Sequence, residues 1–322
     1  MSPPDEISAW IISDGTRGME VQSLALARAL ELDPAVKRIR PAPWLRAFPS
    51  LGARRAIPAA AGGDRLEPPW PDLVIGCGRR TAGAVLSVKT RSGGRSFAVQ
   101  IQDPRIDPES FDALVVPEHD PVRGANVILS TGSLNALAFT DLKAEAARFS
   151  GLIRSLPGPR VLVAVGGPTR KQKIDPALAE QFVRDLEQLI DCGCGLMMTV
   201  SRRTPEPLAH ALKALAEAEP AAMLWDGTGE NPYFGFLGAA DAIVVSSDSV
   251  NMTSEACSSG KGVYVADLLV PSGRIGTFQK TLRERGLTRH FAGHVEPFLY
   301  EPLRDAEKAA EALRGLMARR QS

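Results

Sequence analysis

One local pattern occurs in both halves of the sequence and constrains the fold most: a short apolar run, a glycine turn and an amphipathic helix. In the first half, the apolar run at residues 8–13 is followed by Asp14-Gly15 and by a helical repeat over residues 19–32. In the second half, residues 161–165 are followed by Gly166-Gly167 and by a helix predicted over residues 176–191. Strands that alternate with helices favour parallel sheets. We therefore predict an α/β protein with two Rossmann-like doubly wound domains.

The proposed boundary between the two domains is Pro157-Gly158-Pro159, which ends a helix predicted over residues 141–156. The predicted domains are residues 1–157 and 158–322, and 322 residues exceed what one hydrophobic core usually supports. Two such domains facing each other would form a central cleft, where ligands usually bind. The last predicted helix, residues 305–320, is expected to be a terminal packing helix, and the first domain is one surface on which it could pack.

The remaining elements follow from apolar runs and helical spacing. Further strands are predicted at residues 36–40, 72–76, 97–102, 113–117, 127–130, 195–201, 223–226, 241–246 and 262–266, and further helices at 81–89, 205–217, 234–239 and 253–259.

Composition excludes several classes of protein. The 38 Lys and Arg residues balance 37 Asp and Glu residues, so no overall field attracts nucleic acid. No apolar run approaches the roughly 20 residues of a membrane-spanning helix. The first six residues lack a basic segment, so we expect a cytoplasmic location. The four cysteines and four histidines are scattered, and no metal site is predicted.

Residues 240–256 form the most informative segment, because a buried strand there ends in a turn rich in hydroxyl and amide groups that opens a helix. Backbone N–H groups and hydroxyls at such a turn favour a phosphate. Glu255, expected in the first helical turn, could accept hydrogen bonds from ribose hydroxyls. Alternatively, residues 249–253 only cap the helix and Glu255 completes the capping arrangement. The candidate binding residues are Ser247, Ser249, Asn251, Thr253, Ser254 and Glu255.

A second candidate segment follows the strand at residues 161–165. Gly166 and Gly167 would let a ligand approach the backbone closely, and the cations behind them could neutralise a diphosphate. The candidates after the glycine pair are Thr169, Arg170, Lys171 and Gln172. Ser201 and Arg202, at the end of the next strand, add donors on the same edge of the sheet.

The run ADAIVVSSDSVNMTSEACSSGKGVYVADL resembles the donor-sugar motif of GT-B glycosyltransferases, the two-Rossmann-domain class that includes the enzyme adding N-acetylglucosamine to the peptidoglycan lipid precursor. The resemblance implies that Glu255 holds the nucleotide ribose. The runs SDGTRGMEVQSLALARAL, QIQDPR, AVGGPTRKQ and SSDSVNMTSEA are together similar to the mitochondrial fission family named for the elongated-mitochondria phenotype (ELM), from about residue 10 to residue 298. That family lies within the GT-B-like superfamily and has a plant member implicated in organelle division.

The turn after the first strand carries Asp14, Gly15, Arg17 and Gly18. In the transferases that the chain resembles, the equivalent turn belongs to the acceptor side and abuts the donor phosphates. Asp14 could be a general base for an acceptor hydroxyl, or it could cap the helix that starts near Arg17. His119 is the other candidate base. The sequence does not decide between them.

These features predict a GT-B-type glycosyltransferase-like protein that uses a nucleoside-diphosphate sugar. No Asp-x-Asp pair is present, so we expect metal-independent chemistry with no further cofactor. The expected acceptor is lipid-linked or part of the cell envelope, which would place the protein peripherally at the inner membrane. A non-catalytic nucleotide-sugar-binding adaptor in membrane division or envelope processes is the alternative, and an epimerase of UDP sugars is a third. The sugar, the nucleotide, the acceptor, the stereochemical course and the oligomeric state stay open.

Overall fold

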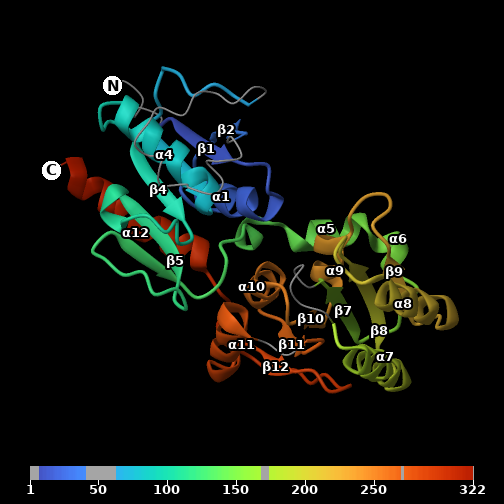
Figure 1. Ribbon diagram of the computed structural model, residues 1–322. Coiled ribbons are helices and arrows are strands. Elements are labelled where there is room, and N and C mark those ends of the chain that lie inside the picture. The colour runs from blue at the N-terminus through green and yellow to red at the C-terminus, as the bar shows by residue number, and fades with distance from the viewer. Residues whose placement is uncertain (1–6, 41–62, 168–173, 270–271, 322) are drawn as a thin grey trace. The chain divides into compact units, whose positions relative to one another are not determined.

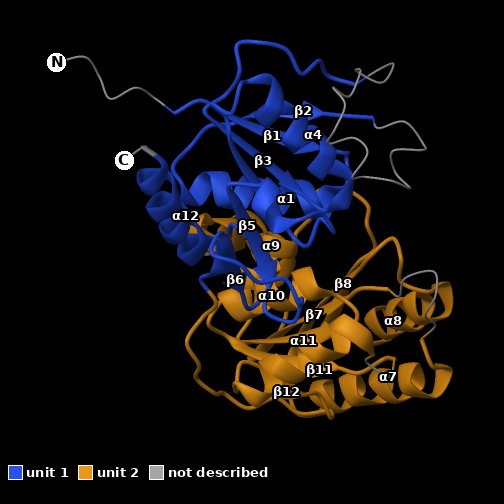
Figure 2. Ribbon diagram, turned by 60° about the vertical axis from the view of Figure 1, so that its left-hand side comes forward, with its two compact units in different colours: residues 1–136, 304–322 blue, residues 137–303 orange. Residues whose placement is uncertain are grey.

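The computed structural model describes residues 7–40, 63–167, 174–269 and 272–321 (Figure 1). The chain divides into two compact units, unit 1 with residues 1–136 and 304–322, and unit 2 with residues 137–303 (Figure 2). The first division thus falls at Ala136–Leu137, whereas the sequence placed it at residue 157. The segment between these two positions packs on unit 2, and the last helix packs on unit 1.

Unit 1 contains a six-stranded parallel sheet in the order β2-β1-β3-β4-β5-β6. Its central strands are buried on both faces and consist almost wholly of apolar residues, as expected for a parallel sheet covered by helices. The strands are β1 (Ala9–Ser13), β2 (Ala35–Arg38), β3 (Leu73–Cys77), β4 (Phe97–Ile101), β5 (Ala113–Pro117) and β6 (Val127–Ser130).

The helices of unit 1 include the last helix of the chain. Among the described residues they are α1 (Arg17–Ala29), α4 (Arg79–Arg91), α12 (Asp305–Gln321) and the short 3₁₀ helix η1 (Pro108–Ser110). α12 packs against α1 and β6. Its first residue, Asp305, accepts backbone hydrogen bonds from Thr131 at 3.1 Å and from Gly132 at 2.8 Å. These two bonds fasten the returning chain to the end of β6.

Unit 2 repeats the parallel arrangement with the strand order β12-β11-β10-β7-β8-β9. The chain first builds outward from β7 through β8 to β9, and then returns to the other side of β7 with β10. The strand order therefore reverses between β7 and β10. The strands are β7 (Arg160–Val165), β8 (Gly195–Val200), β9 (Ala222–Trp225), β10 (Ala242–Ser246), β11 (Gly262–Ala266) and β12 (Arg289–His290).

The helices of unit 2 are η2 (Leu137–Phe139), α5 (Leu142–Arg148), α6 (Ser150–Ile153), α7 (Pro176–Asp191), α8 (Glu206–Ala218), α9 (Tyr233–Ala239), α10 (Val250–Ser258) and α11 (Gly273–Glu284). The prediction of a single helix over residues 141–156 is therefore wrong. It is divided into α5 and α6 at Phe149, whose backbone angles of φ −100° and ψ 13° are not helical. The break lets Phe149 enter the hydrophobic core of unit 2.

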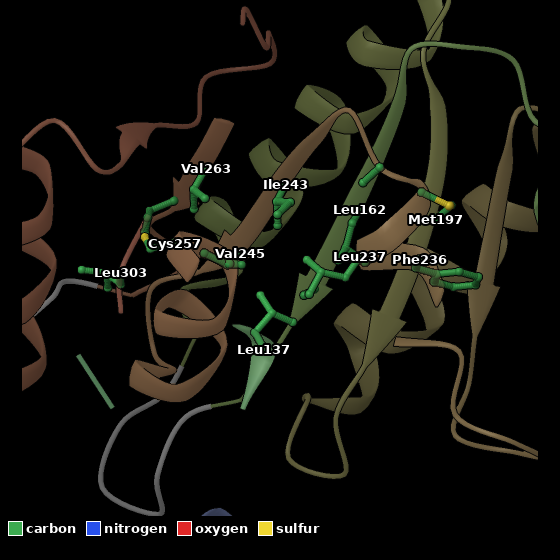
Figure 3. Close-up of a cluster of buried hydrophobic side chains, with 14 of the residues drawn as sticks. Leu137, Leu162, Met197, Phe236, Leu237, Ile243, Val245, Cys257, Val263 and Leu303 are labelled. Carbon is green, nitrogen blue, oxygen red and sulfur yellow. The ribbon is translucent and has the colours of Figure 1, made fainter. Parts of the chain in front are cut away.

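That core explains why unit 2 begins at Leu137. Figure 3 shows Leu137, Phe236, Leu237 and Val245 in one cluster of buried side chains. Phe149, Ile153 and Leu156 belong to the same cluster. α5 lies close against α9 because Gly238 has no side chain, since a Cβ atom there would lie 2.1 Å from the carbonyl oxygen of Leu142. The proline-rich junction is therefore an internal turn of unit 2.

Candidate functional site

The reversal of strand order between β7 and β10 marks the edge of unit 2 where a ligand is expected. In open α/β sheets, ligands bind outside the carboxyl ends of the strands at the point where the order reverses. β7 and β10 pair in parallel, with Val245 opposite Ala164, so the loops that follow them start at the same edge. Those loops contain the glycine pair at residues 166–167 and the polar turn at residues 247–249, which follows Ser246 at the end of β10.

Direct hydrogen bonds join these two loops. The N–H of Gly166 donates to Oγ of Ser246 at 2.8 Å, and the N–H of Gly167 donates to Oδ2 of Asp248 at 2.8 Å. A Cβ atom at Gly166 would lie 2.4 Å from Oδ2 of Asp248. A Cβ atom at Gly167 would lie 2.0 Å from the carbonyl oxygen of Arg203. Glycine is required here because the loops themselves approach so closely, and both N–H groups are already bonded within the protein.

The loop after β8 joins the same edge. The N–H of Ser201 donates to Oγ1 of Thr204 at 2.9 Å, and the Thr204 hydroxyl donates to the carbonyl oxygen of Gly166. Arg202 and Arg203 are exposed. The structure thus places Ser201 at the same edge as the glycine pair, as the parallel arrangement predicts, and Arg202 follows it on the exposed surface. The predicted candidates Thr169, Arg170, Lys171 and Gln172 lie outside the described residues.

The start of α10 is capped by Ser249. Its Oγ accepts a hydrogen bond from the N–H of Met252 at 3.3 Å. The hydroxyl of Thr253 donates to the carbonyl oxygen of Ser249 at 2.8 Å, and that of Ser254 donates to Val250 at 2.7 Å. The capping interpretation therefore describes Ser249, and the hydroxyl protons of Thr253 and Ser254 are bonded within their own helix. Asn251 is half-buried in the first turn.

The expectation that Glu255 lies in the first helical turn is wrong. α10 begins at Val250 rather than at Thr253, so Glu255 belongs to the second turn, and the first turn holds no acidic residue. The stabilising field of a helix N-terminus, which falls off within the first turn, is therefore not what holds this carboxylate. Instead, its side chain is hydrogen-bonded with Tyr233 of α9. Burial, the Glu255 charge and this hydrogen bond hold the pKa of Tyr233 well above its ordinary value.

In unit 1, Asp14 stands at the carboxyl end of β1. Its Oδ1 accepts the N–H of Thr16 at 3.0 Å, and its Oδ2 lies 3.2 Å from Arg80. Burial raises the pKa of Asp14, but hydrogen bonds from Thr16 and the charge and hydrogen bond of Arg80 outweigh it, so the pKa lies below its ordinary value. A carboxylate with a lowered pKa is a weaker base. Asp14 does not cap α1, because Thr16 occupies that position without a side-chain hydrogen bond.

The other candidates of unit 1 lie on the same edge of its sheet. Gly15 is exposed and has a φ of 80°, a conformation that favours glycine. Arg17 is the exposed first residue of α1, and Gly18 follows it. His119 is half-buried just after β5. β3 and β4 separate β1 from β5, so Asp14 and His119 do not share one strand end.

Sequence reasoning missed three side chains at the edge of unit 2. Asp248 lies within the run that drew attention, but an acid is not expected in an anion site, and its role as an acceptor for Gly167 is visible only in the fold. Tyr233 and Gln279 contact α10 from α9 and α11. Such contacts between helices distant in the sequence leave no local signal.

Across the described ranges, no three His, Cys, Asp or Glu side chains gather closely enough to hold a metal ion. Within the same ranges, none of the helices combines the length and apolar character needed to span a bilayer.

Comparison with known proteins decides the family. The family model described as "Mitochondrial fission ELM1" matches residues 17–317. The chain belongs to the mitochondrial fission ELM1 family. One relative of this ELM1-family chain is the mitochondrial fission protein ELM1 of Arabidopsis thaliana, 33% identical over 282 residues. The match covers 79% of this chain and 66% of the plant protein, so the chain spans slightly less than two thirds of that relative's length.

A second relative and several solved structures extend the comparison. An uncharacterised protein of Rickettsia prowazekii is 25% identical, with 96% of this chain and 98% of that protein covered. The UDP-GlcNAc 2-epimerase of Methanocaldococcus jannaschii matches with a TM-score of 0.61 and 13% identity, covering 97% of this ELM1-family chain and 100% of the epimerase. The ADP-heptose LPS heptosyltransferase II of E. coli matches with a TM-score of 0.50 and 13% identity, and the match covers 98% of this chain and 100% of the transferase. At such identities the likeness shows the fold alone, which is the predicted GT-B-like α/β fold with two Rossmann-like units.

Proposed function

We propose that this chain is a GT-B-type, glycosyltransferase-like protein that binds a nucleoside-diphosphate sugar at the carboxyl edge of unit 2. The observation that carries the proposal is the meeting of the loops after β7, β8 and β10 where the strand order reverses. Hydrogen bonds between these loops hold them in place before any ligand arrives, and a site organised in advance loses less entropy on binding.

The proposed roles follow from side-chain chemistry. Glu255 accepts hydrogen bonds from the vicinal ribose hydroxyls, and its bond with Tyr233 fixes the carboxylate. Exposed Arg202 supplies positive charge to the diphosphate, together with Arg170 and Lys171, which follow the glycine pair in the sequence. These cations stabilise the charge of the departing nucleotide without a metal ion. The acceptor is a hydroxyl of a lipid-linked or envelope molecule, reached at a membrane surface.

The state of Asp14 supports a second candidate. Its carboxylate is engaged by Thr16 and Arg80, and its lowered pKa disfavours the role of general base. A protein that keeps the nucleotide-sugar site without a working base would act as a binding adaptor in membrane division or envelope processes. Turnover distinguishes the two candidates, since only the transferase releases free nucleoside diphosphate in the presence of an acceptor.

A thermal-shift screen against UDP, GDP, ADP and CMP sugars tests the shared part of the proposal. A ligand at 100 times its dissociation constant adds about 2.7 kcal/mol of stability. We expect one of the nucleoside-diphosphate classes, UDP, GDP or ADP, to raise the melting temperature, and we expect the free sugar and the CMP sugars, which carry a single phosphate, to leave it unchanged. No shift with any of the four classes would contradict both candidates.

A further inference from the structure

Gln279 is a buried polar residue that neither the sequence motifs nor the proposed ligand contacts include. It lies on α11 with only 2% of its surface exposed. Its Nε2 donates to the carbonyl oxygen of Ser247 at 3.0 Å and to Oγ1 of Thr253 at 3.2 Å. One side-chain amide therefore holds both the loop after β10 and the first turns of α10.

These bonds continue into the loop. Thr253 accepts from Gln279 and donates its own hydroxyl proton to the carbonyl oxygen of Ser249. The N–H of Ser247 in turn donates to Ala266 of β11 at 3.0 Å. Hydrogen bonds arranged in series polarise and strengthen one another. The backbone from Ser247 to Ser249 is thus fixed from β11 on one side and from α11 on the other.

Two buried polar atoms beside this network, Oε1 of Gln279 and Oγ of Ser247, have no hydrogen-bond partner among the residues that the structure describes. An unsatisfied buried polar group costs stability, and its presence in a native fold calls for an explanation. Gln279 also lines a cavity of about 750 Å³, together with Asp267, Ser272, Gly276, Thr277 and Lys280. An apolar side chain at position 279 would remove the unpartnered Oε1, but it would also take the donor away from the carbonyl oxygen of Ser247 and from Oγ1 of Thr253. The glutamine therefore holds the loop at the cost of one unsatisfied oxygen.

We propose that Gln279 is a positioning residue, which sets the conformation of the Ser247–Ser249 loop so that the loop is ready to bind its ligand. The inference rests on the proposed function for the identity of that ligand. The positioning itself is a property of the unliganded chain and can be measured without one.

The test compares the full-length protein with Gln279→Met, which keeps the length of the side chain and removes its amide. Gln100→Leu is the matched control, because Gln100 is likewise fully buried in unit 1, donates from Nε2 to Gly78 at 2.8 Å and has an unpartnered Oε1. Hydrogen–deuterium exchange is followed by mass spectrometry. We expect at least tenfold faster exchange over residues 246–254 in Gln279→Met and unchanged exchange there in Gln100→Leu.

The second readout is affinity for UDP-N-acetylglucosamine, measured by calorimetry and corrected for the folded fraction. We expect at least a tenfold loss for Gln279→Met and less than a twofold change for Gln100→Leu. Thr253→Val removes one of the two groups to which Gln279 donates, so the double variant should lose less affinity than the sum of the losses in the two single variants.

The two readouts separate the two proposals. If the wild-type protein does not bind this probe or the other three nucleotide-sugar classes, the proposed function fails, while the exchange data still judge the positioning role. If Gln279→Met is less stable but shows neither faster exchange over residues 246–254 nor a loss of affinity in its folded fraction, Gln279 is structural and the inference is overturned.

Discussion

Two adjacent glycines determine how closely the loops after β7, β8 and β10 of unit 2 approach one another. The position that a Cβ atom would take is already occupied at both glycines. At Gly166 it is occupied by the side chain of Asp248, and at Gly167 by the backbone of Arg203. The backbone of Arg203 cannot rotate away as a flexible side chain would. Gly167 is therefore the position where a single methyl group should disturb the candidate site most.

We expect Gly167→Ala to destabilise unit 2 by about 1–3 kcal/mol, the usual cost of overpacking. Urea unfolding measures the change. Gly151→Ala is the matched control, because Gly151 lies in α6 with no atom within 4 Å of an added Cβ, and alanine favours a helix. Equal stability of Gly167→Ala and the wild-type protein would contradict the close approach of the two loops.

A second prediction concerns Glu255. Glu255→Ala should weaken the binding of a nucleoside-diphosphate sugar by roughly tenfold or more, as loss of a charge-assisted hydrogen bond implies. The fold should persist, because the residue is only half-buried. Calorimetry gives the affinity, with Glu206→Ala as the control, because the side chain of Glu206 is exposed at the start of α8. Unchanged affinity in Glu255→Ala would remove the ribose assignment.

Among the elements, α10 depends on its cap. Ser249→Ala removes the acceptor for the N–H of Met252 and should cost about 1 kcal/mol of stability. Ser249→Asp should retain most of it, because aspartate is an equally good cap. Thermal unfolding of the three proteins tests this, and equal losses for both variants would show that the hydroxyl acts otherwise than as a cap.

The sequence allowed most elements to be predicted where local signals are strong. The strand at residues 113–117 and the helix at residues 176–191 have the predicted bounds, because apolar periodicity and an Asp-Pro start mark them clearly. The start of α10 was placed three residues too late, since Val250, Asn251 and Met252 follow several serines and resemble a turn. The break at Phe149 has no local signal, because it depends on the core of unit 2.

Only those residues of the candidate site that directly follow a strand could be predicted from the sequence. Parallel strands bring their carboxyl ends to one edge, and this placed Gly166 and Ser201 on the same edge of the sheet. The partners of these groups could not be predicted. The bond from Gln279 to Ser247 joins residues 32 positions apart, and no periodicity encodes it.

For the whole molecule, the division into two units predicts which fragments of the chain can fold independently. Unit 2 is one continuous segment, so a fragment of residues 137–303 should fold alone. A fragment of residues 158–303 should not, because it lacks Phe149, Ile153 and Leu156 of the core. Circular dichroism and thermal unfolding of the two fragments test the boundary. A cooperative transition of similar midpoint in both would support the boundary near residue 157 instead.

The central claim is that the carboxyl edge of unit 2 binds a nucleoside-diphosphate sugar. Hydrogen–deuterium exchange of the 322-residue chain, with and without saturating nucleotide sugar from the thermal-shift screen, tests it most directly. The account predicts slower exchange over residues 201–204 and 246–255, where the loops after β8 and β10 lie, and over Gly166 and Gly167. Saturating ligand that leaves all of these segments unchanged, or that protects only unit 1, would contradict it.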